Sequence, residues 1–124
     1  MSGMQKNYVE AAKQNEYFRQ TIVTGEHSQV VVMALQPGED IGEETHDGDQ
    51  ILFFVEGKGE AVLDGESSPV RPNDMVFVPA GTLHNFINTG GLKLRLVTTY
   101  APPEHPDGTV HKTKADAEAA EQHS

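Results

Sequence analysis

The sequence predicts a single all-β domain, and three observations support this prediction. The chain has 124 residues, which is enough for one core and too short for two independent domains. Its twelve glycines and seven prolines fall between short apolar runs, as turn residues do between strands. From Leu92 to Tyr100, leucines alternate with Lys93 and Arg95, which indicates an antiparallel strand with one buried and one exposed face.

The N-terminal segment differs from this strand pattern. Apolar residues recur with a weak helical spacing from Tyr8 to Gln20, so we expect a short helix or an arm there. We therefore assign residues 1–21 to an N-terminal arm, residues 22–100 to the β-domain and residues 101–124 to a C-terminal tail.

Short strands with hairpin spacing are expected between the arm and the tail. Each apolar run is bounded by turn residues such as Gly, Pro, Asn and Asp. The expected strands are Val30–Leu35, Gln50–Val55, Glu60–Leu63, Met75–Val78, Leu83–Ile87 and Leu92–Tyr100. Such a series favours a sandwich or a closed barrel, because both limit the exposed edges that invite aggregation.

The C-terminal tail begins with a stiff segment. Three prolines and a glycine exclude a helix or a central strand from Ala101 to His111. A segment fixed by prolines has a low entropic cost of docking, so it is available to fold over the barrel mouth or onto a partner subunit. Lys114–Gln122 is rich in Ala, Glu and Asp, and we expect a short polar helix there.

Composition and charge exclude several classes of function. Nineteen acidic and nine basic residues give a formal charge of −10, which repels nucleic acids and anionic membranes. The absence of cysteine excludes disulfides, thiolate metal sites and thiol nucleophiles. No apolar run approaches the roughly 20 residues of a membrane span, and the start of the chain lacks a signal-peptide core. We expect a cytoplasmic protein without nucleic-acid or membrane partners.

Four polar side chains are predicted to converge on the inner face of the strands. Glu44 and His46 are two residues apart, so on a strand both project to the same side. His84 shares the parity of Phe86, and Gln50 begins an apolar run. The spacing leaves two interpretations open, a metal site or a hydrogen-bonded core histidine.

At these residues the sequence resembles the cupin superfamily. The first family motif runs Gly, five residues, His-x-His, three or four residues, Glu, six residues, Gly, and its spacing is reproduced by Gly38, Glu44, His46, Gln50 and Gly57. The second runs Gly, five residues, Pro-x-Gly, two residues, His, three residues, Asn, and is matched by Asn73, Pro79, Gly81, His84 and Asn88. The resemblance implies a jelly-roll β-barrel, also called a double-stranded β-helix. The chain looks most like small stand-alone cupins described as similar to phosphomannose isomerase.

The chain departs from the family pattern in its ligand set. Glu44 stands where the family has its first His, Gln50 stands where it has Glu, and Asn73 replaces a turn Gly. The carboxylate has moved rather than vanished, so the resemblance still implies one divalent ion, held by Glu44, His46, Gln50 and His84. These donors suit Fe, Mn, Ni or Zn. Without the amide of Gln50, the remaining three form the two-His-one-carboxylate arrangement of Fe(II) oxygen chemistry.

Three further residues are candidates for acid–base catalysis. Tyr100 has the inner parity, and it is either a proton donor or a core tyrosine with its hydroxyl at the rim. Glu104 and His105 form an acid–base pair only if the tail closes the pocket. We expect His27, His105 and His111 on the surface or in loops.

Three functions remain open from the sequence. The first is a metal-dependent enzyme that acts on a small oxygenated molecule, sugar-like or carbonyl/enol, by isomerase, lyase or oxygenase chemistry. The second is a non-catalytic module or sensor that binds a small ligand. The third, a structural role without metal, ranks last because a buried Glu44 without a cation is costly.

Two partner predictions accompany these functions. The ligand is expected to be a small molecule, but a phosphosugar needs Arg or Lys in the pocket, and Lys93 and Arg95 are predicted to face outward. The arm and the tail are available for exchange between protomers, and we expect a homodimer.

Overall fold

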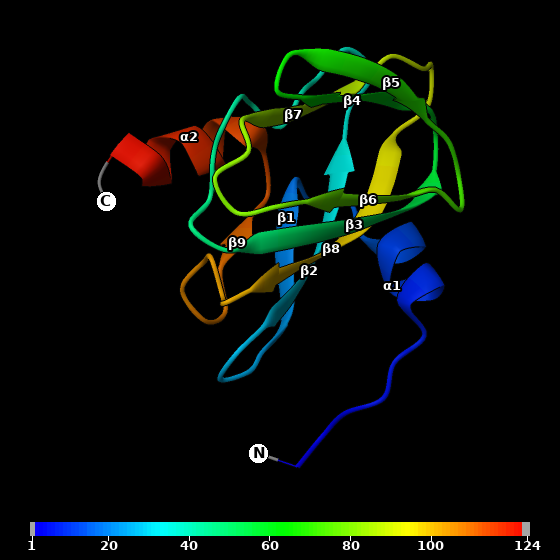
Figure 1. Ribbon diagram of the computed structural model, residues 1–124. Coiled ribbons are helices and arrows are strands. Elements are labelled where there is room, and N and C mark those ends of the chain that lie inside the picture. Colours follow the sequence, from blue (N-terminus) through cyan, green and yellow to red (C-terminus); the bar gives the residue numbers. More distant parts are fainter. Residues whose placement is uncertain (1, 123–124) are drawn as a thin grey trace.

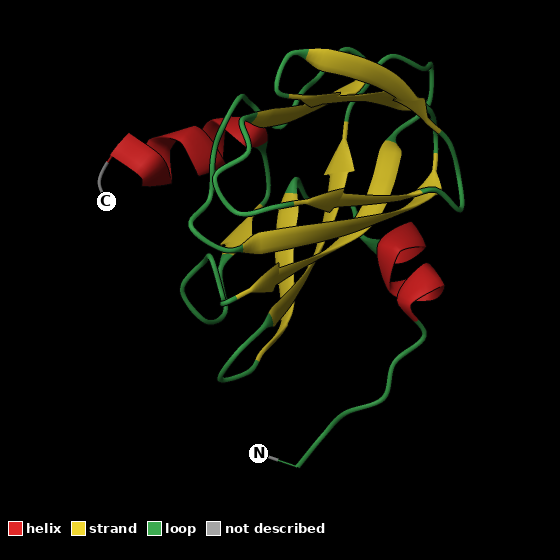
Figure 2. Ribbon diagram, in the orientation of Figure 1, coloured by secondary structure: helices red, strands yellow, loops and turns green. Residues whose placement is uncertain are grey.

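The computed structural model describes residues 2–122 and contains two β-sheets that face each other (Figures 1 and 2). The elements are α1 (Tyr8–Gln14), β1 (Arg19–Thr24), β2 (Gln29–Leu35), β3 (Asp49–Glu56), β4 (Gly59–Leu63), β5 (Glu66–Val70), β6 (Met75–Val78), β7 (His84–Asn88), β8 (Leu94–Ala101), β9 (Val110–His111) and α2 (Lys114–Gln122). The larger sheet has the order β6-β3-β8-β2-β1-β9 and the smaller one β5-β4-β7, with all pairs antiparallel. The all-β jelly-roll prediction is confirmed.

The main core lies between the two sheets. Alternate side chains of β3, β7 and β8 point inward, and the rings of Phe54 and Phe86 meet across the core with their centroids 5.9 Å apart. The predicted alternation of β8 is confirmed, since its inward side chains are all buried: Leu94, Leu96, Thr98 and Tyr100. Leu92 precedes the strand and is 68% exposed, so the pattern began two residues later than predicted.

The N-terminal helix is shorter than predicted. It ends at Gln14 because Asn15 turns the chain, donating from its side-chain amide to the Tyr17 carbonyl and accepting from the Tyr17 N–H. The next residues enter β1, so the segment assigned to an arm contributes its last residues to the larger sheet. Helix α1 packs Ala12 against the outer face of that sheet, on the side opposite α2 (Figure 1).

Two edge strands were not predicted. β5 is largely exposed and contains a proline, so its sequence has no hydrophobic alternation to detect. β9 pairs Val110 and His111 with the start of β1, so a segment expected as loop forms the edge of the larger sheet.

The division of the chain into arm, barrel and tail stays a prediction. No helix of residues 2–122 has the length and apolar character needed to cross a membrane.

The backbone explains one departure from the family motif. Asn73 lies in the turn before β6 with a φ of 77°. This left-handed region favours Gly, but Asn adopts it more readily than most other residues. The turn is therefore preserved with Asn73 in place of glycine.

Candidate metal centre

Backbone pairing brings two of the predicted ligands together. Glu44 and His84 form an isolated antiparallel bridge, in which the N–H of each donates to the carbonyl of the other at 3.0 Å. Residues directly opposite each other in such a pair place their side chains on the same face. The carbonyl of His46 accepts from the Gly81 N–H at 2.8 Å, which ties the segment to the turn before β7. Hydrogen bonds between backbone groups thus position all three side chains.

The three side chains form a compact cluster at one mouth of the barrel. Glu44, His46 and His84 each offer a ligand atom, and these atoms all lie within 4.8 Å of one another. Oε1 of Glu44 is 3.3 Å from Nε2 of His46 and 3.9 Å from Nε2 of His84. Both imidazoles are buried, while the Glu44 side chain is 26% exposed. Three of the four predicted ligands therefore meet.

Further contacts orient the two imidazoles. Nδ1 of His84 lies 2.8 Å from the Thr82 carbonyl, which requires Nδ1 to carry the proton and donate it. Nε2 of His84 then has a free lone pair, and it is buried without a hydrogen-bond partner among residues 2–122. Nδ1 of His46 lies 3.0 Å from Oε1 of Glu104. Both rings thus direct Nε2 toward Glu44, as metal-binding histidines do when another group holds Nδ1.

Gln50 lies on β3, inside the same end of the barrel. It is 1% exposed, and its Nε2 donates to Oγ1 of Thr98 at 3.0 Å. Its Oε1, the atom predicted to be a ligand, is buried and has no hydrogen-bond partner among the described residues. Gln50 does not belong to the close cluster of three, and its role as a fourth ligand stays a prediction.

The charges of the cluster stabilise one another. Burial raises the pKa of Glu44, but contact with His46 and the charge of Arg19 outweigh it, so the pKa is lowered overall. Burial lowers the pKa of His46, but Glu44 and Glu104 outweigh it and raise the pKa overall. A divalent cation would take the place of the imidazolium proton that these carboxylates favour.

The predicted acid–base residues lie near the cluster. The ring of Tyr100 meets His46 edge-on at 5.5 Å and His105 edge-on at 5.2 Å, and burial raises the pKa of its phenol. Burial, followed by the charge of Arg19, lowers the pKa of His105 to about 4. Glu104 contacts His46 rather than pairing with His105. The catalytic roles of Tyr100, Glu104 and His105 stay predictions.

The C-terminal tail passes over the barrel mouth of its own chain. The side chain of Gln29 clamps it, donating to the His105 carbonyl at 2.8 Å and accepting from the His105 N–H at 3.0 Å. A Cβ atom on Gly48 would lie 2.5 Å from the Ala101 carbonyl oxygen, so the close approach of the tail requires glycine. These contacts carry Glu104 to His46.

A cavity of about 460 Å³ opens beside the cluster, under the tail and α2. Arg19, Glu44, His46, Glu104 and His105 are among its lining residues. Small-molecule sites span about 300–1,000 Å³, so the volume suits a small ligand.

The cavity contains two residues whose place the sequence did not predict. Arg19 fell within the segment with helical spacing, although the β-branched residues that follow it, Thr21 to Thr24, are typical of a strand. His111 was expected on the surface or in a loop, but it lies in β9 and lines the cavity. His105 lines it too, whereas His27 is exposed as predicted.

The donor set fits a divalent transition metal. Two imidazole Nε2 atoms and one carboxylate, without any thiolate, suit Fe, Mn, Ni or Zn. The orphaned Nε2 of His84 and Oε1 of Gln50 are buried polar atoms that a cation would satisfy. Glu44, His46 and His84 would hold the ion.

A two-sheet jelly roll with a histidine–carboxylate cluster at one mouth defines a class of small β-barrel proteins with a candidate metal site. Residues 31–100 match the family model described as the cupin domain, and the chain belongs to the cupin family.

Several known proteins are similar to this chain. It is 50% identical over 123 residues to the uncharacterised protein YrkC of Bacillus subtilis, covering 93% of this chain and 66% of that protein. The crystal structure of BH2720 from Bacillus halodurans superposes with a TM-score of 0.94 at 42% identity and covers 95% of both chains. An acireductone dioxygenase of Parvibaculum lavamentivorans is 35% identical over 68 residues, covering 52% of this chain and 37% of the enzyme. Some relatives are therefore enzymes.

Proposed function

We propose that this cupin is a metal-dependent enzyme that acts on a small oxygenated molecule of the carbonyl or enol class. The observation that carries the proposal is the cluster of Glu44, His46 and His84 at the wall of a cavity. Two imidazoles and one carboxylate leave several coordination positions open for water or substrate. Among isomerase, lyase and oxygenase chemistry, this set favours the oxygenase class, and the similarity to a dioxygenase supports it.

The residues around the cluster have separable tasks in this proposal. Glu44, His46 and His84 would hold the ion, which when bound supplies Lewis-acid or oxygen-activating chemistry. Oε1 of Glu104 lies 3.0 Å from Nδ1 of His46, so Glu104 would hold the proton of that nitrogen and orient the ring as a positioning residue. The tail and α2 form one side of the cavity.

A non-catalytic ligand-binding or sensor module is the second candidate. A pKa of about 4 for His105 and a raised pKa for Tyr100 are poorly matched to proton transfer near neutral pH. If neither His105 nor Tyr100 can exchange a proton with the ligand near neutral pH, the cavity is better suited to binding a ligand than to converting it. A homodimer and a cytoplasmic location stay predictions.

Metal content is the first test. Protein purified without chelator or nickel affinity resin is analysed for metals, as wild type and as Glu44→Ala and His84→Ala. We expect about one equivalent of a divalent transition metal in wild type and its loss in both variants. A metal-free wild type that stays empty after reconstitution, with both variants folded, would contradict the proposal.

Turnover then separates the two candidates. Fe(II)-loaded protein is mixed with a panel of small enols and hydroxy ketones, and oxygen uptake and product formation are followed. An enzyme converts many equivalents of one compound. Stoichiometric binding without turnover across the panel supports the binding module.

A further inference from the structure

A buried arginine lines the cavity beside the metal centre. Arg19 begins β1 and is 2% exposed. Its guanidinium lies over the ring of Phe18, 5.3 Å from the centroid, and its Nη1 donates to Nδ1 of His111 at 3.0 Å. These contacts hold the guanidinium against the cavity wall.

The guanidinium of Arg19 has an unpartnered donor and makes no direct ion pair with any carboxylate of residues 2–122, although its charge acts on Glu44. This donor is Nε, which is buried. A buried charge without a partner is costly, and so is a buried N–H donor without an acceptor. His111 accepts the one hydrogen bond as a neutral ring, consistent with its pKa being lowered by burial and then by Arg19.

The two acidic residues nearest the metal centre are engaged elsewhere. Glu44 contacts His46 and His84, and Glu104 contacts Nδ1 of His46. Arg19 and this cluster nevertheless line the same cavity. A ligand in the cavity is therefore within reach of both a cationic anchor and the metal centre.

We propose that Arg19 anchors the carboxylate of a small anionic ligand that also reaches the metal centre through a second oxygen. The inference rests on the proposed function, because it names the class of ligand for the same site. The planar guanidinium fork matches the two oxygens of a carboxylate. Three acidic side chains, Glu44, Glu104 and Glu121, line the cavity and favour a singly charged carboxylate over a phosphate dianion.

Calorimetric titration of the Mn(II)-loaded protein tests the anchor with three probes. Glycolate carries a carboxylate and a neighbouring hydroxyl, glycolamide is its neutral analogue, and methyl phosphate is the competing anion. We expect glycolate to bind about tenfold to a hundredfold more tightly than glycolamide, because hydrogen bonds to charged groups are the stronger ones. Tighter binding of methyl phosphate would overturn the assignment to carboxylates.

Substitutions localise the effect. Arg19→Met removes the charge at similar volume, and we expect it to abolish the preference for glycolate while metal content stays at the wild-type level. Arg19→Lys should retain part of the preference. Arg95→Met, a partly buried arginine outside the cavity, serves as the matched control and should leave the preference unchanged. An unchanged preference in folded, metal-loaded Arg19→Met would overturn the inference.

A second readout separates this inference from the metal proposal. In ¹⁵N-labelled, metal-free protein, the Nε–H signal of Arg19 is assigned by its loss in Arg19→Met. Glycolate is expected to shift this signal and glycolamide is not. If wild type takes up no metal, the proposed function fails while a glycolate-dependent shift still supports the anchor. A signal that stays in place under saturating glycolate would overturn the anchor, whatever the metal content.

Discussion

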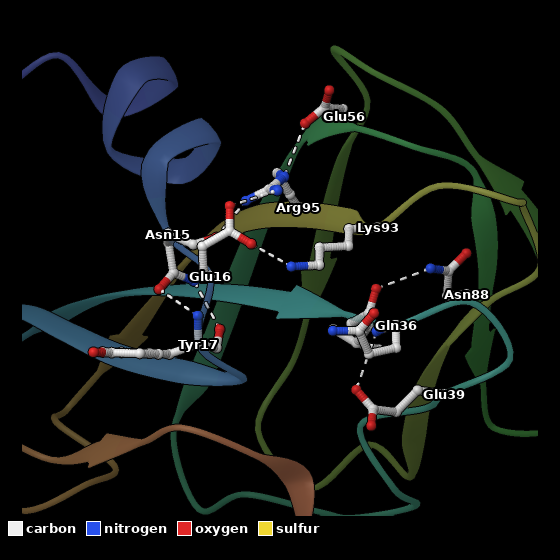
Figure 3. Close-up of polar contacts among 10 residues, drawn as sticks. Asn15, Glu16, Tyr17, Gln36, Glu39, Glu56, Asn88, Lys93 and Arg95 are labelled. Atoms are coloured by element: carbon white, nitrogen blue, oxygen red, sulfur yellow. Dashed lines mark hydrogen bonds and ion pairs between the residues drawn. The ribbon is translucent and has the colours of Figure 1, made fainter.

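Two arginines on opposite faces of the larger sheet have contrasting environments. Arg95, on the outer face of β8 near α1, has all three guanidinium nitrogens engaged: Nη2 contacts Glu16 at 3.0 Å, Nε contacts Glu56 at 2.9 Å and Nη1 donates to the Asn15 carbonyl (Figure 3). Lys93 joins the same group through Glu16. Among residues 2–122, the guanidinium of Arg19 has one hydrogen-bond partner, the ring of His111, and its Nε has none.

This difference distinguishes a stabilising charge network near α1 from a candidate ligand site near α2. At the end near α1, Lys93 and Arg95 are matched by Glu16 and Glu56, so this network holds no unpaired charge that would call for a ligand. At the mouth near α2, buried donors and acceptors are left without partners among residues 2–122: Arg19 Nε, Gln50 Oε1 and His84 Nε2. Native proteins satisfy most buried polar groups, so a cluster of exceptions marks a place for a ligand or an ion.

The largest effect is expected from the clamp that holds the tail. Gln29→Leu leaves the backbone N–H and carbonyl of His105 without partners, and we expect the free energy of unfolding to fall by about 2–3 kcal/mol. Metal affinity should fall as well, since Glu104 loses its support. Urea unfolding and metal titration measure both, with exposed Gln36→Leu as control. Wild-type stability in Gln29→Leu would show that the clamp is not needed.

A smaller loss, confined to the mouth, is expected from Glu104→Gln. The amide keeps the size of the side chain but holds the His46 proton less strongly, so metal affinity should drop about 10- to 100-fold. The free energy of unfolding of the metal-free protein should fall less than in Gln29→Leu, because the Glu104 side chain is partly exposed. Glu56→Gln, at the other end of the barrel, is the control and should leave metal affinity unchanged. Equal metal affinities for Glu104→Gln and Glu56→Gln would refute the positioning role.

Near α1 we expect the reverse result, a loss of stability without a loss of metal. Arg95→Met removes three contacts, and we expect unfolding to become easier by about 1–2 kcal/mol with metal content unchanged. Lys93→Met, which loses one ion pair to exposed Glu16, should destabilise the protein less than Arg95→Met does, because water screens an exposed pair. Urea unfolding with elemental analysis checks both variants. Loss of metal in Arg95→Met would erase the distinction between the two ends.

The smallest effect is expected from His105→Asn, in the pH dependence of the free energy of unfolding. The folded pKa of His105 is about 4, below the value of about 6.5 expected in the unfolded chain. As the pH falls, the unfolded state binds a proton on His105 at a higher pH than the folded state does. The contribution of neutral His105 to the free energy of unfolding is therefore complete above about pH 6.5 and is lost as the pH falls toward about 4. Metal-free His105→Asn should lose less stability than wild type between pH 7 and pH 5. Exposed His27→Asn should follow the wild-type curve, and a His105→Asn curve parallel to it would count against the assignment.

Local spacing was sufficient for the inner faces of the strands. Alternation in β8 correctly placed Leu94, Leu96, Thr98 and Tyr100 inside, because a strand has a fixed period of two and one buried face. Spacing alone left the nature of the polar site open, and it was the resemblance to the cupin motifs that implied Glu44, His46 and His84, which the structure brings together. These features depend on neighbours along the chain or on the register of one strand pair.

The contents of the cavity could be decided only by tertiary structure. Arg19 and His111 are 92 residues apart, and they meet because β9 adds to the edge of β1. Glu104 reaches His46 because Gln29 fixes the tail across the mouth, a contact that no local pattern encodes. The sequence by itself therefore determined an all-β domain and, through its cupin motifs, the barrel and the three close metal-ligand candidates. Long-range pairing decided which charges share the cavity and which remain unpaired there.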